Sequence, residues 1–384
     1  MSTSSPSKSS ALETTLTRNW LRRGPLACAL WPVSLLFRAL SGLRAAMFRA
    51  GLLTSARLPV PVVVVGNIYI GGTGKTPLTI WLVQALQAAG MTPGVISRGH
   101  GSDGSDGSAA REVTQASTPA QVGDEPLLIK QRTGCPVMVG RDRAATGRAL
   151  LAAHPEVNIL LTDDGLQHYA LQRDVEIILF DGRGAGNGWL LPAGPLREPV
   201  SRRRDFTVIN TPQLTEELAR SVGCQIEPKS RPLRSGSDPV RGLTPGSRSA
   251  GLGGRPIQMT LEGQFAEQLI DRSQRRSLST LAQSDLRLAA AAGIGNPARF
   301  FGMLKAAGLR ITELPLPDHH DFQDRPFAAL DADLILMTEK DAVKCAQIEE
   351  LRDDPRLWVV PVTAHLDGAL AEQIVEKCRG RSIA

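Results

Sequence analysis

The stretch that decides the fold is Val62-Val-Val-Val-Gly-Asn-Ile-Tyr-Ile-Gly-Gly-Thr-Gly-Lys-Thr76. Its valine run is typical of a buried parallel strand, and a helix-forming segment follows the glycines. Strand, glycine loop and helix in this order predict a phosphate-binding P-loop. In such a loop the backbone N–H groups and the helix N-terminus bind phosphates, Lys75 reaches the β and γ oxygens, and the Thr76 hydroxyl binds Mg²⁺. The predicted nucleotide-binding residues are therefore Tyr69, Ile70, Gly71, Gly72, Thr73, Gly74, Lys75 and Thr76.

The loop is a variant of the strict G-x-x-x-x-G-K-[ST] pattern. Tyr69 stands where the first glycine of that pattern belongs. The Gly-Gly-Thr-Gly-Lys-Thr core resembles the loops of membrane-associated partitioning ATPases, but Ile70 replaces the signature lysine of those proteins. This replacement weakens the interpretation as a dimeric regulatory ATPase.

Short apolar runs alternate with helical patterns along the rest of the chain. This alternation predicts an α/β fold of the P-loop NTPase type, with a mostly parallel sheet covered by helices and a smaller α/β second lobe. The predicted domains are residues 1–57 as leader and N-terminal helix, 58–226 as P-loop core, 227–255 as an irregular linker or insertion, and 256–384 as the second lobe. The predicted strands are Val62–Gly66, Gly94–Ile96, Pro136–Val139, Asn158–Leu161, Val175–Phe180, Phe206–Ile209, Ala289–Gly293, Leu334–Met337 and Trp358–Pro361; two helices of the second lobe are expected near Ala298–Ala307 and Ala369–Lys377.

Positive charge is concentrated at the N-terminus. The first 57 residues contain eight Lys and Arg against one Glu, a net charge of +7, which leaves −1 for the rest of a chain whose total is +6. A basic arm on a nearly neutral body favours an anionic membrane surface as partner and argues against a nucleic acid. The five scattered cysteines show no C-x-x-C pair and indicate reduced thiols in the cytoplasm.

The N-terminal arm also carries apolar residues at helical spacing. The uncharged run from Gly24 to Phe37 contains two prolines and is shorter than the ~20 residues of a spanning helix. From Val33 onward, an apolar stripe with arginines on the opposite side predicts an amphipathic helix. The stripe could pack on the protein's own core, but its basic flank favours a helix lying in the membrane interface; its members are Val33, Leu36, Leu40, Leu43 and Met47. Met1 to Ser10 are predicted to form a disordered leader.

Two acidic motifs follow the P-loop. Asp163 and Asp164 come directly after an apolar strand, at the sheet edge where such folds bind ligands, so either carboxylate could hold Mg²⁺. Asp-Asp-Gly is also a common turn. Asp124 and Glu125 begin a predicted helix, where Asp also serves as an N-cap.

A histidine pair lies in the second lobe, at His319 and His320 of the sequence Pro317-Asp-His-His-Asp-Phe322. Adjacent histidines cannot easily share one zinc ion. A general-base or orienting role for His319, paired with a carboxylate, is chemically simpler. A surface histidine without a catalytic role is the alternative.

Together these four segments resemble the tetraacyldisaccharide 4′-kinase family from about Arg38 to the C-terminus. Further segments that carry the resemblance are Ser97–Gly101, Gly140–Arg143, Asp181-Gly182, Asn187-Gly188, Leu191–Glu198, Gly293–Phe300 and Thr338–Asp341. The resemblance implies transfer of the γ-phosphate of ATP to the 4′-hydroxyl of a tetraacyldisaccharide 1-phosphate, which gives lipid IVA. It also implies a membrane-bound monomer on the cytoplasmic face of the bacterial inner membrane.

The resemblance also implies residue roles. Asp124 is the expected base toward the sugar hydroxyl, His319 its partner, and Lys75 the phosphate-binding lysine. Glu125, Asp163 and Asp164, together with Thr76, are the expected Mg²⁺ ligands.

For the 1-phosphate of the lipid we expect arginines, because guanidinium groups match phosphate oxygens. Arg197 with the neighbouring Glu198, and Arg202 to Arg204, are the candidates. A solvated basic face is the alternative. ATP is preferred over GTP because the lysine of Thr338–Asp341 stands one position too late for the N-K-x-D guanine motif.

Two rival functions share parts of this pattern. A membrane-associated regulatory ATPase would use the same loop and anchor but would be stimulated by a protein partner. A binding module would hold nucleotide only as a structural element, and intact Lys75 and Thr76 argue against it.

Overall fold

Buried runs of Val, Ile and Leu form parallel strands, as the sequence predicts. The structure, a computed structural model, describes residues 19–99, 110–225 and 254–379. It comprises a larger compact unit, residues 44–67, 71–176 and 259–384, and a smaller one, residues 1–43, 68–70 and 177–258. The predicted leader, residues 227–253 of the predicted linker, and His100 and Gly101 lie outside the described residues.

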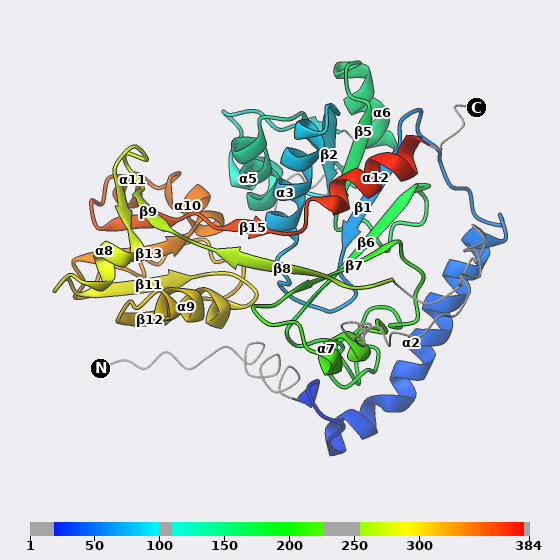
Figure 1. The fold of residues 1–384 in the computed structure, drawn as a ribbon, viewed down its shortest axis with the longest axis horizontal. Helices are drawn as coiled ribbons and strands as arrows, with labels where there is room; N and C mark the ends of the chain where they lie inside the picture. The colour runs from blue at the N-terminus through cyan, green and yellow to red at the C-terminus, as the bar shows by residue number, and fades with distance from the viewer. Residues whose placement is uncertain (1–18, 100–109, 226–253, 380–384) are drawn as a thin grey trace, which may run out of the picture. The chain divides into compact units, whose positions relative to one another are not determined.

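The P-loop strand β1 begins a run of five neighbouring strands in the larger unit, which are part of a nine-stranded sheet. The register places Val65 of β1 opposite Asp163 of β5, so both strands end at the same edge. Within this unit the order is β1 (Val62–Gly66), β5 (Ile159–Asp163), β2 (Pro93–Ser97), β4 (Val137–Val139) and β3 (Arg111–Glu112), with only β3 antiparallel to its neighbour. The helices are α3 (Lys75–Ala88), α4 (Pro119–Val122), α5 (Asp124–Thr133) and α6 (Arg143–Ala153), which Figure 1 shows in blue to green.

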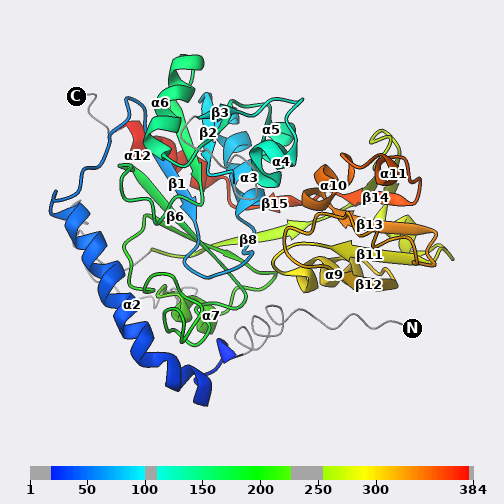
Figure 2. The ribbon, with the colours of Figure 1, turned by 180° about the vertical axis from the view of Figure 1, so that it is seen from behind.

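A second, six-stranded sheet in the same unit is formed by residues of the predicted second lobe. Its order is β10 (Arg275–Ser277), β9 (Phe265–Gln268), β14 (Leu357–Val360), β13 (Leu334–Thr338), β11 (Leu288–Ala292) and β12 (Ile311–Pro315). The four strands from β14 to β12 are parallel. Its helices are α8 (Leu278–Ala282), α9 (Pro297–Ala306), α10 (Glu339–Cys345) and α11 (Glu349–Arg352). Figure 2 shows α10 beside α5, with which it packs.

The two faces of this second sheet are buried under separate apolar cores. Phe300, Phe301 and Leu304 of α9 pack on one side, and Phe322 and Phe327 on the other. Because both faces are covered, the central strands carry no polar face, which is why their apolar runs were readable in the sequence.

After β14, the C-terminal part of the chain adds one strand and one helix outside the six-stranded sheet. β15 (Thr363–His365) pairs antiparallel with β8 (Ile257–Glu262), and α12 (Ala369–Arg379) packs on α3. The helix was predicted, but its packing on the P-loop helix was not. The division of the chain at residues 57, 226 and 255 stays a prediction.

The smaller unit contains the rest of the parallel strands. In it, β6 (Val175–Asp181), whose first two residues belong to the larger unit, pairs in parallel with β7 (Phe206–Asn210). A short helix, α7 (Glu216–Ser221), follows. All nine strands that the sequence predicts are present: β1 has the predicted ends, and the ends of the other eight differ by at most two residues.

The N-terminal helix is longer than the sequence predicted. It runs as α2 from Pro25 to Arg49 and includes Pro32, whereas the prediction began it at Val33. A proline inside a helix costs roughly 3 kcal/mol. Two contacts in the smaller unit offset this cost: Ser34 Oγ donates to the Leu190 carbonyl at 2.7 Å, and Trp31 packs on Trp189 with ring centroids 6.3 Å apart.

The length of α2 corrects the sequence-based argument against a membrane span. That argument counted only Gly24 to Phe37, but the 25-residue helix is long and apolar enough to cross a membrane by length and composition. Its apolar stripe does not pack on a core of the described residues: the exposed fraction is 52% for Val33, 60% for Leu36 and 59% for Leu40.

Candidate active site

The P-loop connects β1 to α3 and is shaped by two left-handed glycines. Gly71 has φ 95° and Gly74 has φ 100°, values that favour glycine over any side chain. Buried Asn67 fixes the loop from inside, because its Nδ2 donates to the Gly71 carbonyl at 3.0 Å and to Thr73 Oγ1 at 3.1 Å. Asn67 was not predicted as a site residue, although its place directly after the strand was a signal.

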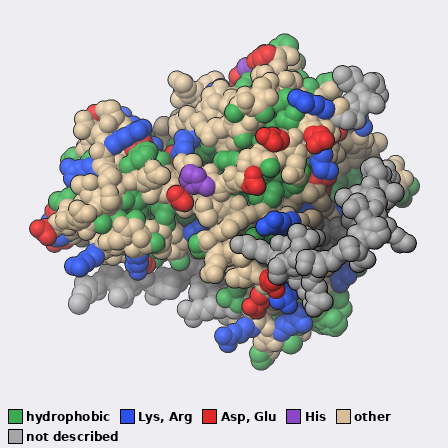
Figure 3. All heavy atoms as spheres, in the orientation of Figure 1, with side chains coloured by type: hydrophobic (Ala, Val, Ile, Leu, Met, Phe, Trp, Pro, Cys, Tyr) green, Lys and Arg blue, Asp and Glu red, His purple; other side chains and the backbone are tan. Residues whose placement is uncertain are grey.

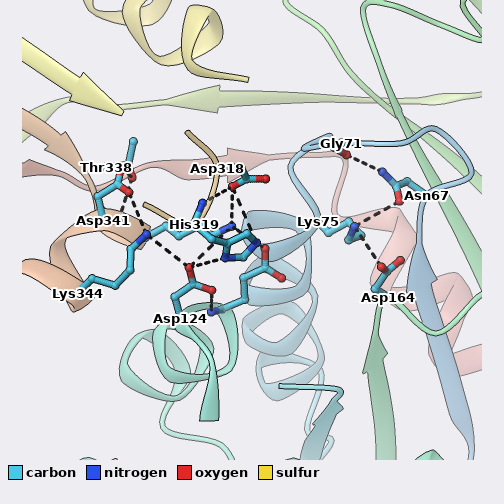
Figure 4. A network of polar contacts seen from close by, with 12 residues as sticks. Asn67, Gly71, Lys75, Asp124, Asp164, Asp318, His319, Thr338, Asp341 and Lys344 are labelled. Carbon is cyan, nitrogen blue, oxygen red and sulfur yellow. Dashed lines mark hydrogen bonds and ion pairs between the residues drawn. The ribbon is translucent and has the colours of Figure 1, made fainter. Parts of the chain in front are cut away.

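Lys75 and Thr76 stand at the start of α3. Lys75 Nζ donates to Asn67 Oδ1 at 3.3 Å and lies 3.6 Å from Asp164 Oδ2 (Figure 4). Thr76 is buried. Asn67 and Asp164 therefore hold the Lys75 ammonium beside the loop, and a bound phosphate would replace the Asp164 carboxylate as its partner.

The predicted carboxylates Asp163 and Asp164 have different environments. Asp163 is buried at the end of β5, and among the described residues its Oδ1 has no hydrogen-bond partner. Burial, with Glu125 nearby, raises the pKa of Asp163 to about 7, against the effects of Lys75 and Arg143. Asp164 has φ 52°, and 37% of its side chain is exposed.

Asp124 and His319 come together, as the sequence-based roles require. Asp124 begins α5 and is buried, and its Oδ2 lies 3.1 Å from His319 Nδ1 (Figure 4). Burial raises the pKa of Asp124, but the hydrogen bond with His319 and the charges of Lys340 and Lys344 outweigh burial and lower that pKa. The same hydrogen bond raises the pKa of His319. The carboxylate is thus charged and held in one orientation.

Two lysines of α10 complete this cluster and were missed as site residues. Lys340 Nζ lies 3.2 Å from Glu125 Oε1, 3.4 Å from Asp318 Oδ1 and 3.9 Å from Asp124 Oδ2. Lys344 Nζ lies 3.8 Å from the same Asp124 oxygen. The two lysines are four residues apart and share a helix face. The four-residue spacing of the two lysines is visible in the sequence, but the sequence does not show that their helix packs against α5.

An ion pair joins α10 to α5. Arg132 Nη1 lies 2.5 Å from Glu339 Oε1 and 2.7 Å from Oε2, and buried Glu339 also accepts from the Val362 N–H at 3.1 Å. This pair fastens the helix that carries Asp124 to the helix that carries Lys340.

The remaining predicted residues belong to the smaller unit. Tyr69 is 1% exposed and packs against the Arg183 guanidinium, 4.3 Å from the ring centroid, while the Ile70 N–H donates to the Pro195 carbonyl at 3.0 Å. The Arg197 N–H donates to the Ile68 carbonyl at 2.7 Å, and Glu198 pairs with Arg202. Arg204 donates to Thr207, Val200 and Val222, so Arg202 and Arg204 have internal partners. The substrate role of Arg197 and Glu198 stays a prediction.

No group of three or more His, Cys, Asp or Glu side chains in the described residues is placed to hold a metal ion. Asp163 Oδ1, buried and lacking a donor within the described ranges, fits a cation or a cation-bound water.

The chain is similar to known proteins over nearly its whole length. The model of the tetraacyldisaccharide-1-P 4′-kinase family matches residues 26–379. A tetraacyldisaccharide 4′-kinase of Janthinobacterium sp. (strain Marseille) is 60% identical, over 98% of this chain and 99% of the relative. One of Herminiimonas arsenicoxydans is 55% identical, over 98% of both chains.

A solved structure extends the likeness to three dimensions. It is the crystal structure of LpxK from Aquifex aeolicus in complex with ATP, with a TM-score of 0.68 and 25% sequence identity, over 92% of this chain and 99% of the other. The P-loop, the paired carboxylates and the near full-length matches lead to one conclusion: this chain belongs to the tetraacyldisaccharide 4′-kinase family.

Proposed function

We propose that this protein transfers the γ-phosphate of ATP to the 4′-hydroxyl of a tetraacyldisaccharide 1-phosphate and forms lipid IVA in lipid A biosynthesis. The observation that carries the proposal is the distribution of charge in the larger unit. A P-loop with Lys75 lies on one side, and a charged carboxylate, Asp124, is oriented by His319 on the other. Family membership supports this activity and does not favour the regulatory ATPase.

The roles follow from the loose transition state of phosphoryl transfer, which requires positioning and charge neutralisation more than a strong base. P-loop N–H groups and Lys75 hold the phosphates. Asp124, with its lowered pKa, accepts the hydroxyl proton late, and His319 keeps the carboxylate oriented. Thr76, Asp163, Asp164 and Glu125 are the proposed protein side of a Mg²⁺ site that the nucleotide phosphates would complete, and the ion would supply neutralisation of phosphate charge.

Arg197 and Glu198 are proposed to contact the lipid headgroup, with guanidinium bound to the 1-phosphate. Undiminished affinity for the lipid after Arg197→Ala would remove Arg197 from this role.

The exposed stripe of α2 supports a position at the membrane surface. Leucines along the helix would enter the acyl boundary while arginines reach headgroup phosphates. We propose that the protein is a monomer bound peripherally or monotopically to the cytoplasmic face of the inner membrane. On the face shown in Figure 3, the Lys and Arg side chains of the described residues lie among Asp and Glu side chains.

The base role is tested by Asp124→Asn in the lipid kinase assay. We expect kcat to fall by about 100-fold or more, since a positioned acid–base group contributes roughly that much. Asp321→Asn, an exposed carboxylate in the same loop as His319, is the matched control and should leave kcat unchanged. Retention of more than about a tenth of kcat by Asp124→Asn would exclude the base role.

A further inference from the structure

One segment of the second lobe contacts both halves of the proposed site. It runs from Gly293, directly after β11, to Arg299 in the first turn of α9, and we call it the Gly293–Arg299 segment. It lies entirely within the larger unit, like residues 71–76 of the P-loop and the Asp124–His319 pair.

At its first end the segment is tied to the base side. The Gly293 N–H donates to buried Asp341 Oδ2 at 3.0 Å, and the Gly293 carbonyl accepts from the His319 N–H at 3.2 Å. A Cβ on Gly293 would lie 2.9 Å from Asp341 Oδ1 and 3.1 Å from the His320 Cβ. The backbone that carries His319 therefore rests directly on this glycine.

At its other end the segment is tied to the P-loop. Arg299 Nη1 donates to the Thr73 carbonyl at 3.1 Å. A Cβ on Gly295 would lie 2.7 Å from the Gly72 backbone nitrogen and 3.3 Å from its Cα, and backbone atoms cannot give way as a flexible side chain can. The segment thus touches two loop residues, Gly72 and Thr73, which lie three and two positions before Lys75.

Neither contact is explained by folding of the second lobe alone. The apolar core that α9 shares with β11 uses Phe300, Phe301 and Leu304, not Arg299. Arg299 instead sends a charged side chain to a main-chain carbonyl 226 positions away in the sequence.

We propose that the Gly293–Arg299 segment holds the P-loop in register with the Asp124–His319 pair, and that Arg299 is the positioning residue of this connection. The inference rests on the proposed phosphotransfer. Its physical basis is that the γ-phosphate and the attacking hydroxyl must be aligned, and a misplacement of about 1 Å can lower the rate about 100-fold. Arg299 sets the position of Thr73, and Gly293 sets that of His319.

The primary test measures kcat and both KM values for Arg299→Met and Arg299→Lys. For Arg299→Met we expect kcat to fall by about 10- to 100-fold and KM for ATP to rise, while KM for the lipid stays within about twofold. Lysine keeps one donor but loses the planar fork, so Arg299→Lys should recover part of kcat. Lys305→Met, which removes an exposed cation from the same helix, is the matched control and should behave as wild type. A wild-type kcat for Arg299→Met contradicts the proposal.

A double variant tests the connection itself. If the segment links the two halves, Arg299→Met combined with His319→Ala should lose less activity than the product of the two single losses. Losses that multiply would show that the two halves act independently and would overturn the proposal. If Arg299→Met is insoluble, Arg299→Gln, which keeps a donor on a shorter side chain, gives the same comparison.

The contact between Arg299 and the P-loop can be tested separately from the proposed function. A wild-type protein that does not phosphorylate the lipid refutes the function. In that case the affinity of a fluorescent ATP analogue still tests the P-loop contact, since Arg299→Met should bind it more weakly than Lys305→Met. Equal affinity would contradict the role of Arg299.

Discussion

At the residue scale, burial of the Asp163 carboxylate lowers the stability of the folded protein, although the same carboxylate is a proposed Mg²⁺ ligand. Its carboxyl is fully buried, and its raised pKa, about 7, shows that ionisation inside the protein is unfavourable. An unfolded Asp titrates near ~3.9. As pH rises from about 4 to about 7, the native state therefore loses stability relative to the unfolded chain, and it does not regain that stability at higher pH.

Asp163→Asn should consequently raise the melting temperature of the nucleotide-free protein at pH 8 and have little effect near pH 4. Its kinase activity should fall by at least roughly 10-fold, since loss of a group that only supports a metal ligand already costs about 10- to 100-fold. Scanning calorimetry at both pH values checks the first part. Asp164→Asn, whose carboxylate is partly exposed, is the control and should show no such pH-dependent gain. An equal gain at both pH values would refute the assignment of the pKa.

Gly295 packs so closely on the P-loop that there is no room for a side chain at this position. Gly295→Ala would place its Cβ 2.7 Å from the Gly72 nitrogen, so the loop or the segment must shift. We expect KM for ATP to rise by at least about fivefold, because a shift of this size misplaces the phosphate-binding N–H groups. Gly302→Ala, on α9 with open space around it, should leave KM unchanged and so serves as the control.

At the scale of elements, the pairing of α5 with α10 depends on the Arg132–Glu339 ion pair. Arg132→Met would leave the Glu339 carboxylate buried without its cation, and breaking a buried pair typically costs about 3–5 kcal/mol. We expect a loss of about 3 kcal/mol in the free energy of unfolding, measured in urea. Adding Glu339→Gln to Arg132→Met should restore part of the loss, since a buried amide is less costly than a buried charge. A loss below about 1 kcal/mol would mean that the pair behaves like a surface ion pair.

The helix α2 presents its apolar stripe to solvent, which predicts binding to vesicles. Leu36→Ser together with Leu40→Ser should weaken binding to anionic phospholipid vesicles by at least about tenfold, because each leucine loses roughly 1.5–3 kcal/mol of possible burial. Leu52→Ser, which changes an exposed leucine beyond the helix, is the control. Sedimentation with vesicles measures the bound fraction. Unchanged binding of the double variant would show that α2 does not contact the membrane.

The elements also show what the sequence could predict. Buried strands such as β1, β5 and β13 were located because both of their faces are apolar, so their composition alone identifies them. The edge strand β12 was missed, since its residues are mostly exposed and polar residues interrupt the pattern. The start of α2 was misplaced because Pro25 and Pro32 read as breaks, whereas tertiary contacts kept the helix continuous.

At the scale of the whole molecule, the site combines residues whose partners no local pattern could name. Lys75 was predictable from its loop, and the carboxylate pair at the end of β5 from the rule that parallel strands end at a common edge. Lys340, Lys344 and Arg299 were not predictable, because their role depends on contacts of α10 with α5 and of α9 with the P-loop. Motif spacing describes one element at a time, and these contacts join elements about 200 residues apart in sequence.

The central claim is that this chain is a lipid kinase. The most direct test is transfer of labelled γ-phosphate from ATP to tetraacyldisaccharide 1-phosphate in mixed micelles, with wild type compared to Lys75→Ala. We predict labelled lipid, phosphorylated at the 4′-hydroxyl, with the wild-type protein and only background label with Lys75→Ala. The claim would be contradicted if the wild-type protein bound ATP but left the lipid unlabelled, and hydrolysis stimulated only by a protein partner would then identify a regulatory ATPase.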